Sequence, residues 1–149
     1  MKKFLVSHMD EMLHKQCEEV PFNNTEIITD LVDSFGGRDM VGLAAPQVGL
    51  GYTCCICKFS TGVEVLINPR VELLGDNIIS TERCLSFPNI VCRVTRNNKV
   101  KITYFNSKWE KCEKILENLD ACIAQHEIDH LSGITMLDKA LSKQYKKVR

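Results

Sequence analysis

Apolar residues follow a helical period near the start of the chain. Between Asn24 and Gly37 they fall on one helix face, at Ile27, Ile28, Leu31, Val32 and Phe35. The Asn24 side chain can cap the first turn, and the glycines at positions 36 and 37 can end the last one. The pattern predicts a helix over residues 24–37.

Between residues 41 and 105 the pattern changes to short runs of β-branched residues and cysteines. These runs cover residues 53–59, 63–67 and 100–105, and Gly, Pro and Asn separate them. Runs of this length with such breaks are typical of antiparallel strands. Several short strands are therefore predicted.

A second helical pattern follows a charged stretch at residues 108–117. Asn118 can cap this helix and Gly133 can stop it. The tail after Asp138 is expected to add one last turn or short helix.

Composition narrows the class of protein. The chain has 149 residues, 44% hydrophobic and 26% charged, and we expect one compact domain over residues 1–149. Its 19 basic and 19 acidic residues balance, whereas nucleic-acid-binding proteins usually carry a positive surface. The apolar run at residues 4–6 is too short for an export signal, and no stretch could span a bilayer. We expect a cytoplasmic protein with reduced thiols.

Three cysteines at positions 54, 55 and 57 contain a C-x-x-C pair, which could indicate structural zinc or redox chemistry. No second pair exists in the sequence. Alternation along a strand would also send Cys55 and Cys57 to one face and Cys54 to the other. A packing role is expected.

The strongest chemical pattern is His-Glu-Ile-Asp-His at residues 126–130. Residues four apart on a helix share a face, so His126 and His130 can bind the same metal ion. In hydrolases with this arrangement the carboxylate beside the first histidine takes a proton from the attacking water and returns it to the leaving group. Glu127 is the candidate for that role. The alternative is two ordinary histidines on an amphipathic helix.

A catalytic metal usually has three protein ligands. An extended metzincin would place another histidine where Met136 stands, and a thermolysin-type site needs a later glutamate, yet no Glu follows Glu127. The third ligand is therefore expected upstream. Cys84 is the leading candidate, because cysteine sulfur binds divalent iron or zinc well, although cysteines near apolar runs are more often simply buried.

Three blocks of the sequence resemble the signature motifs of peptide deformylases. They are Val-Gly-Leu-Ala-Ala-Pro-Gln at 41–47, Glu-Arg-Cys-Leu-Ser at 82–86 and Gln-His-Glu-Ile-Asp-His-Leu at 125–131. Their order and spacing also match, and the short C-terminus is similar to that of phage-encoded members. The resemblance implies an α+β fold in which antiparallel β-strands pack around a central metal-binding helix.

The family removes the formyl group from the initiating methionine of new peptides and releases formate. The resemblance implies that Cys84, His126 and His130 hold one divalent metal ion. Fe²⁺ is the native ion that it implies, with Zn²⁺, Ni²⁺ or Co²⁺ able to occupy the site in a purified sample.

The same resemblance assigns the catalytic groups. Glu127 would carry the proton, while the Gln47 side-chain amide and the Leu85 backbone N–H would stabilise charge on the reacting oxygen. Gly42 would let an extended peptide pair with its strand. Further candidates for the substrate site are Val41, Leu43, Arg83, Cys122 and Ile123.

The chain departs from the family at Met40 and Arg83, where glycine is usual. If position 83 needs a positive φ, arginine would be strained by about 1 kcal/mol or more. Arg83 could pair with a substrate carbonyl or carboxylate, or could be a solvated side chain at the rim. A cation such as Arg96 could hold Glu82 and so orient the loop that presents Cys84. The alternative is that Glu82 is an exposed loop acid.

The expected partners are N-formylmethionyl nascent peptides, with no membrane and no specific nucleic acid, and the protein is expected to be a monomer. The basic residues of the tail could contact ribosomal RNA or could belong to a solvated helix end: Lys139, Lys143, Lys146, Lys147 and Arg149. Two alternatives stay open at this point. One is a different metallohydrolase, such as a peptidase, and the other is a non-enzymatic relative that keeps a metal for stability.

Overall fold

The computed structural model describes residues 1–36 and 40–145. The helices are α1 (Thr25–Phe35), α2 (Asn118–Leu131) and α3 (Met136–Lys139), with short 3₁₀ helices at Glu11–His14 and Ala45–Val48. The strands are β1 (Gly42–Ala44), β2 (Cys54–Phe59), β3 (Gly62–Leu73), β4 (Asn77–Cys84), β5 (Phe87–Asn97), β6 (Lys99–Phe105), β7 (Lys111–Glu117) and β8 (Ala140–Tyr145).

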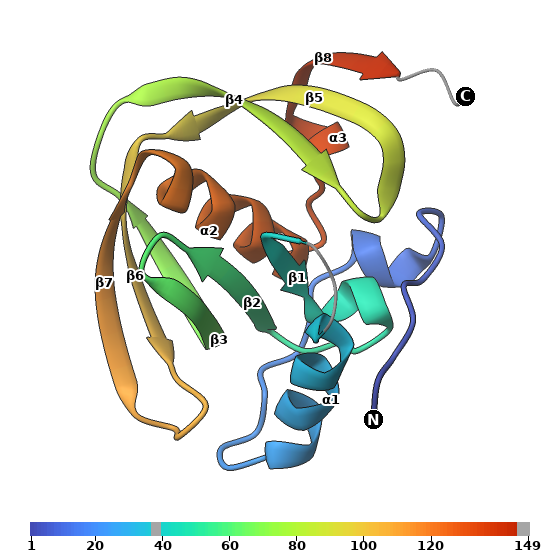
Figure 1. Cartoon of the computed structure of the whole chain (residues 1–149), viewed down its shortest axis with the longest axis vertical. Coiled ribbons are helices and arrows are strands. Elements are labelled where there is room, and N and C mark those ends of the chain that lie inside the picture. The colour runs from blue at the N-terminus through green and yellow to red at the C-terminus, as the bar shows by residue number, and fades with distance from the viewer. Residues whose placement is uncertain (37–39, 146–149) are drawn as a thin grey trace.

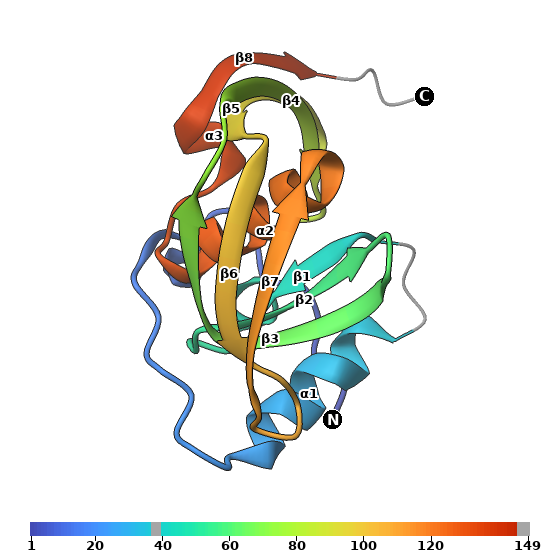
Figure 2. The same cartoon turned by 90° about the vertical axis from the view of Figure 1, so that its left-hand side faces the viewer.

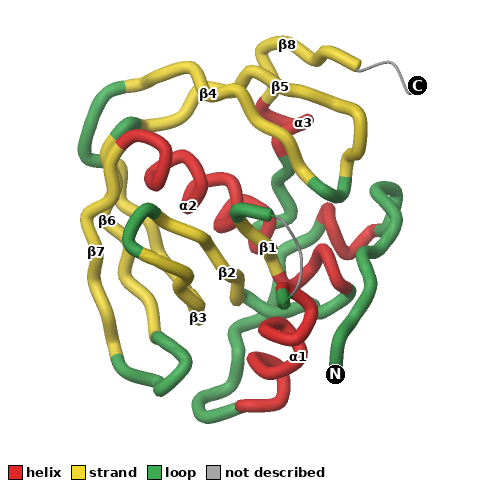
Figure 3. The backbone as a smooth tube through the Cα atoms, viewed as in Figure 1, coloured by secondary structure: helices red, strands yellow, loops and turns green. Residues whose placement is uncertain are grey.

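The strands form two antiparallel sheets. The larger has the order β1-β2-β3-β6-β7 and the smaller the order β4-β5-β8. Figure 1 shows α2 between the two sheets, with β1 and β2 separating it from α1. Figure 3 shows how fully strands surround α2. The expected α+β fold with antiparallel strands around a central helix is confirmed.

Alternation along β2 fills a hydrophobic core on each face of the large sheet. Cys55 and Cys57 pack with α2, whereas Cys54 packs with α1. All three are buried free thiols. The predicted packing role and face assignment are confirmed.

The first helix is confirmed over most of its predicted length. The Asn24 side chain accepts a hydrogen bond from the Ile27 backbone N–H at 3.3 Å, which is the predicted cap. Val32 was placed on the buried face but is 43% exposed, because α1 turns only its Ile27–Ile28–Leu31 side to the sheet. Gly37 lies outside the described residues.

The strands at 53–59, 63–67 and 100–105 are confirmed, but β7 was predicted only as a charged stretch. It is an edge strand whose exposed face carries charged residues. The predicted cap of α2 is also displaced by one residue: Glu117 occupies the N-cap position and Asn118 begins the helix. Gly133, with φ of 75°, follows the helix end as expected.

The tail was predicted to add one last turn or short helix, and α3 is such a turn, but the strand that follows it at Ala140–Tyr145 was not predicted. After the single turn of α3, β8 pairs with β5, and Figure 2 shows it at the end of the molecule opposite α1. Pairing with an existing strand edge overrides local helical preference. The basic residues at 146, 147 and 149 lie outside the described residues. Among the described helices, none is long and apolar enough to cross a membrane.

Candidate active site

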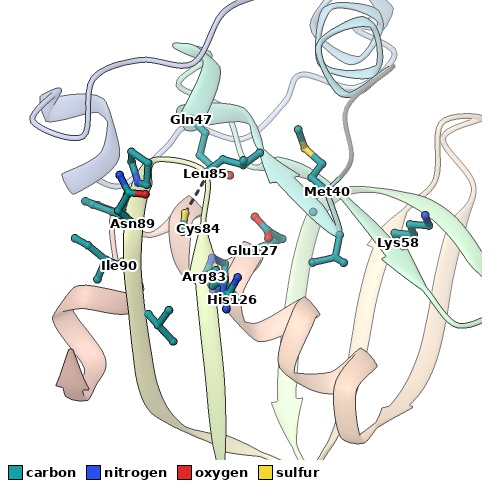
Figure 4. A pocket seen from close by; sticks show the side chains of 15 residues that line it. Met40, Gln47, Lys58, Arg83, Cys84, Leu85, Asn89, Ile90, His126 and Glu127 are labelled. Atoms are coloured by element: carbon teal, nitrogen blue, oxygen red, sulfur yellow. Dashed lines mark hydrogen bonds between the residues drawn. The ribbon is translucent and has the colours of Figure 1, made fainter. Parts of the chain in front are cut away.

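Three parts of the fold meet at one cavity. They are α2, the end of β4 with the turn after it, and the 3₁₀ helix that follows β1. Figure 4 shows Gln47, Cys84, His126 and Glu127 around this cavity, each contributed by one of these parts. Segments far apart in the sequence thus present their polar side chains to a common space.

Cys84, His126 and His130 form a compact cluster of metal-binding side chains. One ligand atom from each lies within 4.8 Å of those of the other two, and all three residues are buried. The helical spacing of four places the two imidazole rings 5.2 Å apart, and β4 supplies the sulfur. The two histidines and the cysteine that the sequence singled out are therefore brought together.

The chemistry of this donor set fits a divalent transition metal. Burial lowers the pKa of His130 to about 3, so its imidazole is neutral and can donate a lone pair. Its Nε2 lies 3.4 Å from the Cys84 sulfur, while its buried Nδ1 has no hydrogen-bond partner among the described atoms. One sulfur and two imidazole nitrogens are ligands that iron and zinc accept.

His126 is oriented by a buried carboxylate. Glu82 Oε1 lies 2.8 Å from His126 Nδ1, and Arg96 makes two hydrogen bonds of 2.8 Å to the Glu82 carboxylate. Burial alone would raise the pKa of Glu82, but the hydrogen bonds from Arg96 and His126 lower it to about 2. The ionised carboxylate makes Nδ1 the donor and leaves Nε2 for the cluster.

The predicted contact between Glu82 and Arg96 is confirmed, and the structure extends it. The Arg96 guanidinium also pairs with Asp129, which in turn accepts from Lys139 Nζ at 2.9 Å. This chain of charges links β4 and β5 to α2 and α3. It holds the cysteine-bearing strand and the histidine-bearing helix in one geometry.

Glu127 lies in the same space with a free carboxylate oxygen. The residue is 4% exposed, and its Oε1 has no hydrogen-bond partner among the described atoms. Burial raises the pKa of Glu127 to about 7. A carboxyl group of this kind can take up and release a proton near neutral pH.

The structure gives a reason for glycine at position 42 that the sequence did not reveal. A Cβ at this position would overlap the Glu127 carboxylate group and lie 2.7 Å from its Cδ and Cγ. Only a residue without a side chain leaves room for the acid. Gly42 therefore lets β1 lie close to Glu127 on α2.

Gln47 is held by hydrogen bonds at both ends of its amide. Its Oε1 accepts from the Ala44 backbone N–H at 2.8 Å, and its Nε2 donates to Ser86 Oγ at 3.0 Å and to Cys84 Sγ at 3.4 Å. The first bond fixes which way the amide faces. The N–H₂ group therefore points toward the cluster, where Leu85 lies in the turn after β4.

The cavity has a volume of about 540 Å³. It is lined by Met40, Val41, Gly42, Gln47, Lys58, Arg83, Cys84, Leu85, Phe87, Pro88, Asn89, Ile90, Val91, His126 and Glu127. The sequence reasoning missed Lys58 and the segment Phe87–Val91. The signal for that segment was its position directly after the cysteine motif.

Three of the residues expected to border the substrate site do not line this cavity. Leu43 packs in the core under α1, and Ile123 packs in the core between α2 and the large sheet. Cys122 is buried on α2. The family resemblance suggested these positions, and their apolar character does not distinguish a cavity wall from the core.

Arg83 lines the cavity without backbone strain. The described residues other than glycine that have positive φ are Asn23, Asn68, Asn89, Trp109 and Asn118. The strain considered for an arginine at position 83 therefore does not arise. Met40, the other departure from the family pattern, lines the same cavity.

The comparison with known proteins agrees with this geometry. The family model described as polypeptide deformylase matches residues 2–146. The peptide deformylase of Thermotoga petrophila is 34% identical over 134 residues, which cover 87% of this chain and 82% of the relative. That of Aquifex aeolicus is 35% identical over 148 residues, covering 93% and 88%.

Solved structures give the same result. The crystal structure of peptide deformylase from Thermotoga maritima matches with a TM-score of 0.87 and 31% identity, covering 95% of this chain and 99% of that one. A peptide deformylase from Synechococcus elongatus in complex with actinonin matches with a TM-score of 0.86 and 28% identity, covering 94% and 79%. The chain therefore belongs to the polypeptide deformylase family.

Proposed function

We propose that Cys84, His126 and His130 hold the metal ion of this deformylase and that Glu127 carries the proton. The enzyme removes the formyl group from the N-terminal formylmethionine of peptides and releases formate. The observation that supports the assignment most strongly is the meeting of three ligand atoms within 4.8 Å beside a carboxylate with an unpartnered oxygen.

A divalent ion bound to this cluster would supply Lewis acidity, making water a better nucleophile and the formyl carbon a better electrophile near neutral pH. We propose Fe²⁺ as the native ion, with Zn²⁺, Ni²⁺ or Co²⁺ able to replace it. The mixed sulfur and nitrogen donors support this set of ions. Glu82 and Arg96 would keep the imidazole of His126 aimed at the ion.

Glu127 would move the proton in both halves of the reaction. It takes a proton from the water whose oxygen adds to the formyl carbon. When the C–N bond breaks, the departing amine receives that proton, and formate and a free amino terminus result. A pKa of about 7, raised by burial, suits a group that must both accept and donate.

Gln47 and the Leu85 backbone N–H would stabilise the negative charge that collects on the former carbonyl oxygen. The Gln47 Nε2 already faces the cluster, since Ala44 and Ser86 hold the amide in place. Its 3.4 Å bond to the Cys84 sulfur is the weaker of its two donations and is the one to be exchanged for the substrate oxygen.

The peptide would lie along β1. This strand is at the edge of the large sheet, so its outer side is open to an added strand. Val41 and Gly42 line the cavity there, and the methionine side chain would enter the space between them and the Phe87–Val91 segment. The free cysteines support a reducing cytoplasmic location, and we propose a monomer.

Ribosome contact through the tail is a further proposal. In the described part of the tail Lys143 lies on β8 and is exposed, whereas Lys139 is paired with Asp129. Because β8 pairs with β5, a charge reversal at Lys143 tests the idea better than a truncation. Ribosome co-sedimentation that is unchanged by Lys143→Glu would argue against contact by that residue.

The substrate assignment is tested with protein purified anaerobically with Fe²⁺. We expect formate release from formyl-Met-Ala-Ser, no acetate release from acetyl-Met-Ala-Ser and no cleavage of peptide bonds. The small formyl carbon and the proton carrier beside it favour deformylation over peptidase action. Peptide-bond cleavage, or equal turnover of the formyl and acetyl peptides, would contradict the proposal.

A further inference from the structure

The mouth of the cavity carries two cations that the catalytic reaction does not use. Arg83, on β4, directly precedes Cys84, and Lys58 stands on β2. Both line the cavity and both are exposed. In Figure 4 they lie on opposite sides of Glu127.

Neither cation is neutralised by an acid in the described part of the chain. Within residues 1–36 and 40–145, no carboxylate forms an ion pair with Arg83 or Lys58. Among the described residues that line the cavity, Glu127 is the sole acid, and it is buried at the bottom. The described lining of the entrance therefore carries net positive charge, although the chain as a whole has balanced charge.

Their positions match the path of an extended peptide. The Lys58 backbone N–H donates to the Val41 carbonyl at 2.7 Å, so Lys58 stands one strand away from the edge at which a peptide would be added. Arg83 is one residue from a ligand of the metal cluster. Successive residues of an extended peptide advance by about 3.3 Å, so residues two and three of a substrate pass within reach of such long side chains.

We propose that Arg83, assisted by Lys58, makes this deformylase favour formyl peptides with an acidic side chain in the residues after methionine. The inference rests on the proposed function and names its substrate class. Arginine suits the task because its planar guanidinium can pair with both oxygens of a carboxylate. The competing reading, a solvated arginine at the rim, predicts no preference.

The test compares formyl-Met-Asp-Ser-amide with formyl-Met-Asn-Ser-amide. The two side chains have nearly the same shape, and the amide removes the terminal carboxylate, so the ratio of their kcat/KM values isolates one charge. An exposed ion pair between Arg83 and the substrate carboxylate should raise kcat/KM for the Asp peptide by about two- to fivefold at low ionic strength. We expect an Asp:Asn ratio of that order at low salt. The ratio should fall toward one as salt is raised to about 0.5 M, where the Debye length is only about 4 Å and exposed charges are largely screened.

Substitutions of Arg83 and Lys58 show which residue causes the preference for the Asp peptide. Arg83→Gln should bring the ratio close to one, Lys58→Gln should lower it by less, and Arg83→Glu should invert it. Lys108→Gln is the matched control, because it removes one exposed positive charge outside the cavity lining and should leave the ratio unchanged.

A wild-type ratio of one or below at low salt would overturn the proposal, as would a preference that survives in both Arg83 variants. These outcomes differ from failure of the proposed function. In that case no formate would be released even from the Asn peptide. The salt dependence of the wild type provides a measurement that needs no substitution.

Discussion

The carboxylate of Glu127 fits against the bare backbone of Gly42, at a place where any Cβ would overlap it. The two residues come from the edge strand β1 and the central helix α2. Their contact couples the strand on which we place the peptide to the acid that we place at the reacting bond. Catalysis depends on such placement to within about 1 Å.

Gly42→Ala should therefore displace the Glu127 carboxylate while leaving Cys84, His126 and His130 in place. We expect a fall in kcat of about 100-fold, since a misplacement of 1 Å can cost that much, with one metal ion still bound per chain. Formate release and metal analysis on the same sample check this. Gly36→Ala is the control, because a Cβ there meets no atom closer than 3.6 Å. Activity close to wild type in Gly42→Ala would show that the acid has room to move.

Metal affinity should depend on Glu82. Glu82→Gln replaces one carboxylate oxygen with an NH₂ group, so the side chain can no longer accept both hydrogen bonds from Arg96, and it loses the negative charge beside His126. Loss of such a supporting carboxylate weakens metal binding by about 10- to 100-fold, measured by competition with a chelator. Glu64→Gln, which removes the partner of Lys114 on the large sheet, should leave metal affinity unchanged. Equal affinities in the two variants would contradict the orienting role of Glu82.

The metal cluster could be predicted because the patterns that indicate it are short and local in the sequence. Four-residue spacing on a helix puts His126 and His130 together, and the family motif supplied Cys84. The pairing of Glu82 with Arg96 was also predicted, because such groups commonly orient the ligands of a metal ion.

Relationships across the fold were beyond local reasoning. Nothing near Gly42 in the sequence indicates that Glu127 packs against it. The family resemblance likewise could not reveal that Leu43 and Ile123 pack in the core rather than in the cavity wall. The strand β8 was missed because its partner β5, and not its own composition, determines its conformation.

In the metal-free protein, burial of the Glu127 carboxylate should lower the free energy of unfolding at high pH. Burial raises the pKa of this carboxyl from 4.5 to about 7, so the wild type loses stability as pH rises through that interval. Glu127→Gln carries no such charge. Its free energy of unfolding should exceed that of the wild type by up to about 3 kcal/mol at pH 8, with the difference vanishing below pH 4.5. Denaturant unfolding across this range measures it, and parallel curves for the two proteins would refute it.

Ser86 should act on catalysis through Gln47. Its hydroxyl accepts from Gln47 Nε2 at 3.0 Å, and both residues are buried. Ser86→Ala should lower kcat by about 3- to 10-fold, the range for loss of one neutral hydrogen bond. In a Gln47→Ala background the same change should have no further effect on kcat. An equal loss in both backgrounds would mean that Ser86 acts independently of the amide.

The central claim is that Glu127 carries the proton and is not needed to hold the metal ion. It is tested most directly with Glu127→Ala. The variant and the wild type are loaded anaerobically with Fe²⁺, their metal content is measured, and each is assayed for formate release from formyl-Met-Ala-Ser. We predict one bound ion in both proteins and formate release by the wild type alone. Formate release by metal-loaded Glu127→Ala at the wild-type rate would contradict the account.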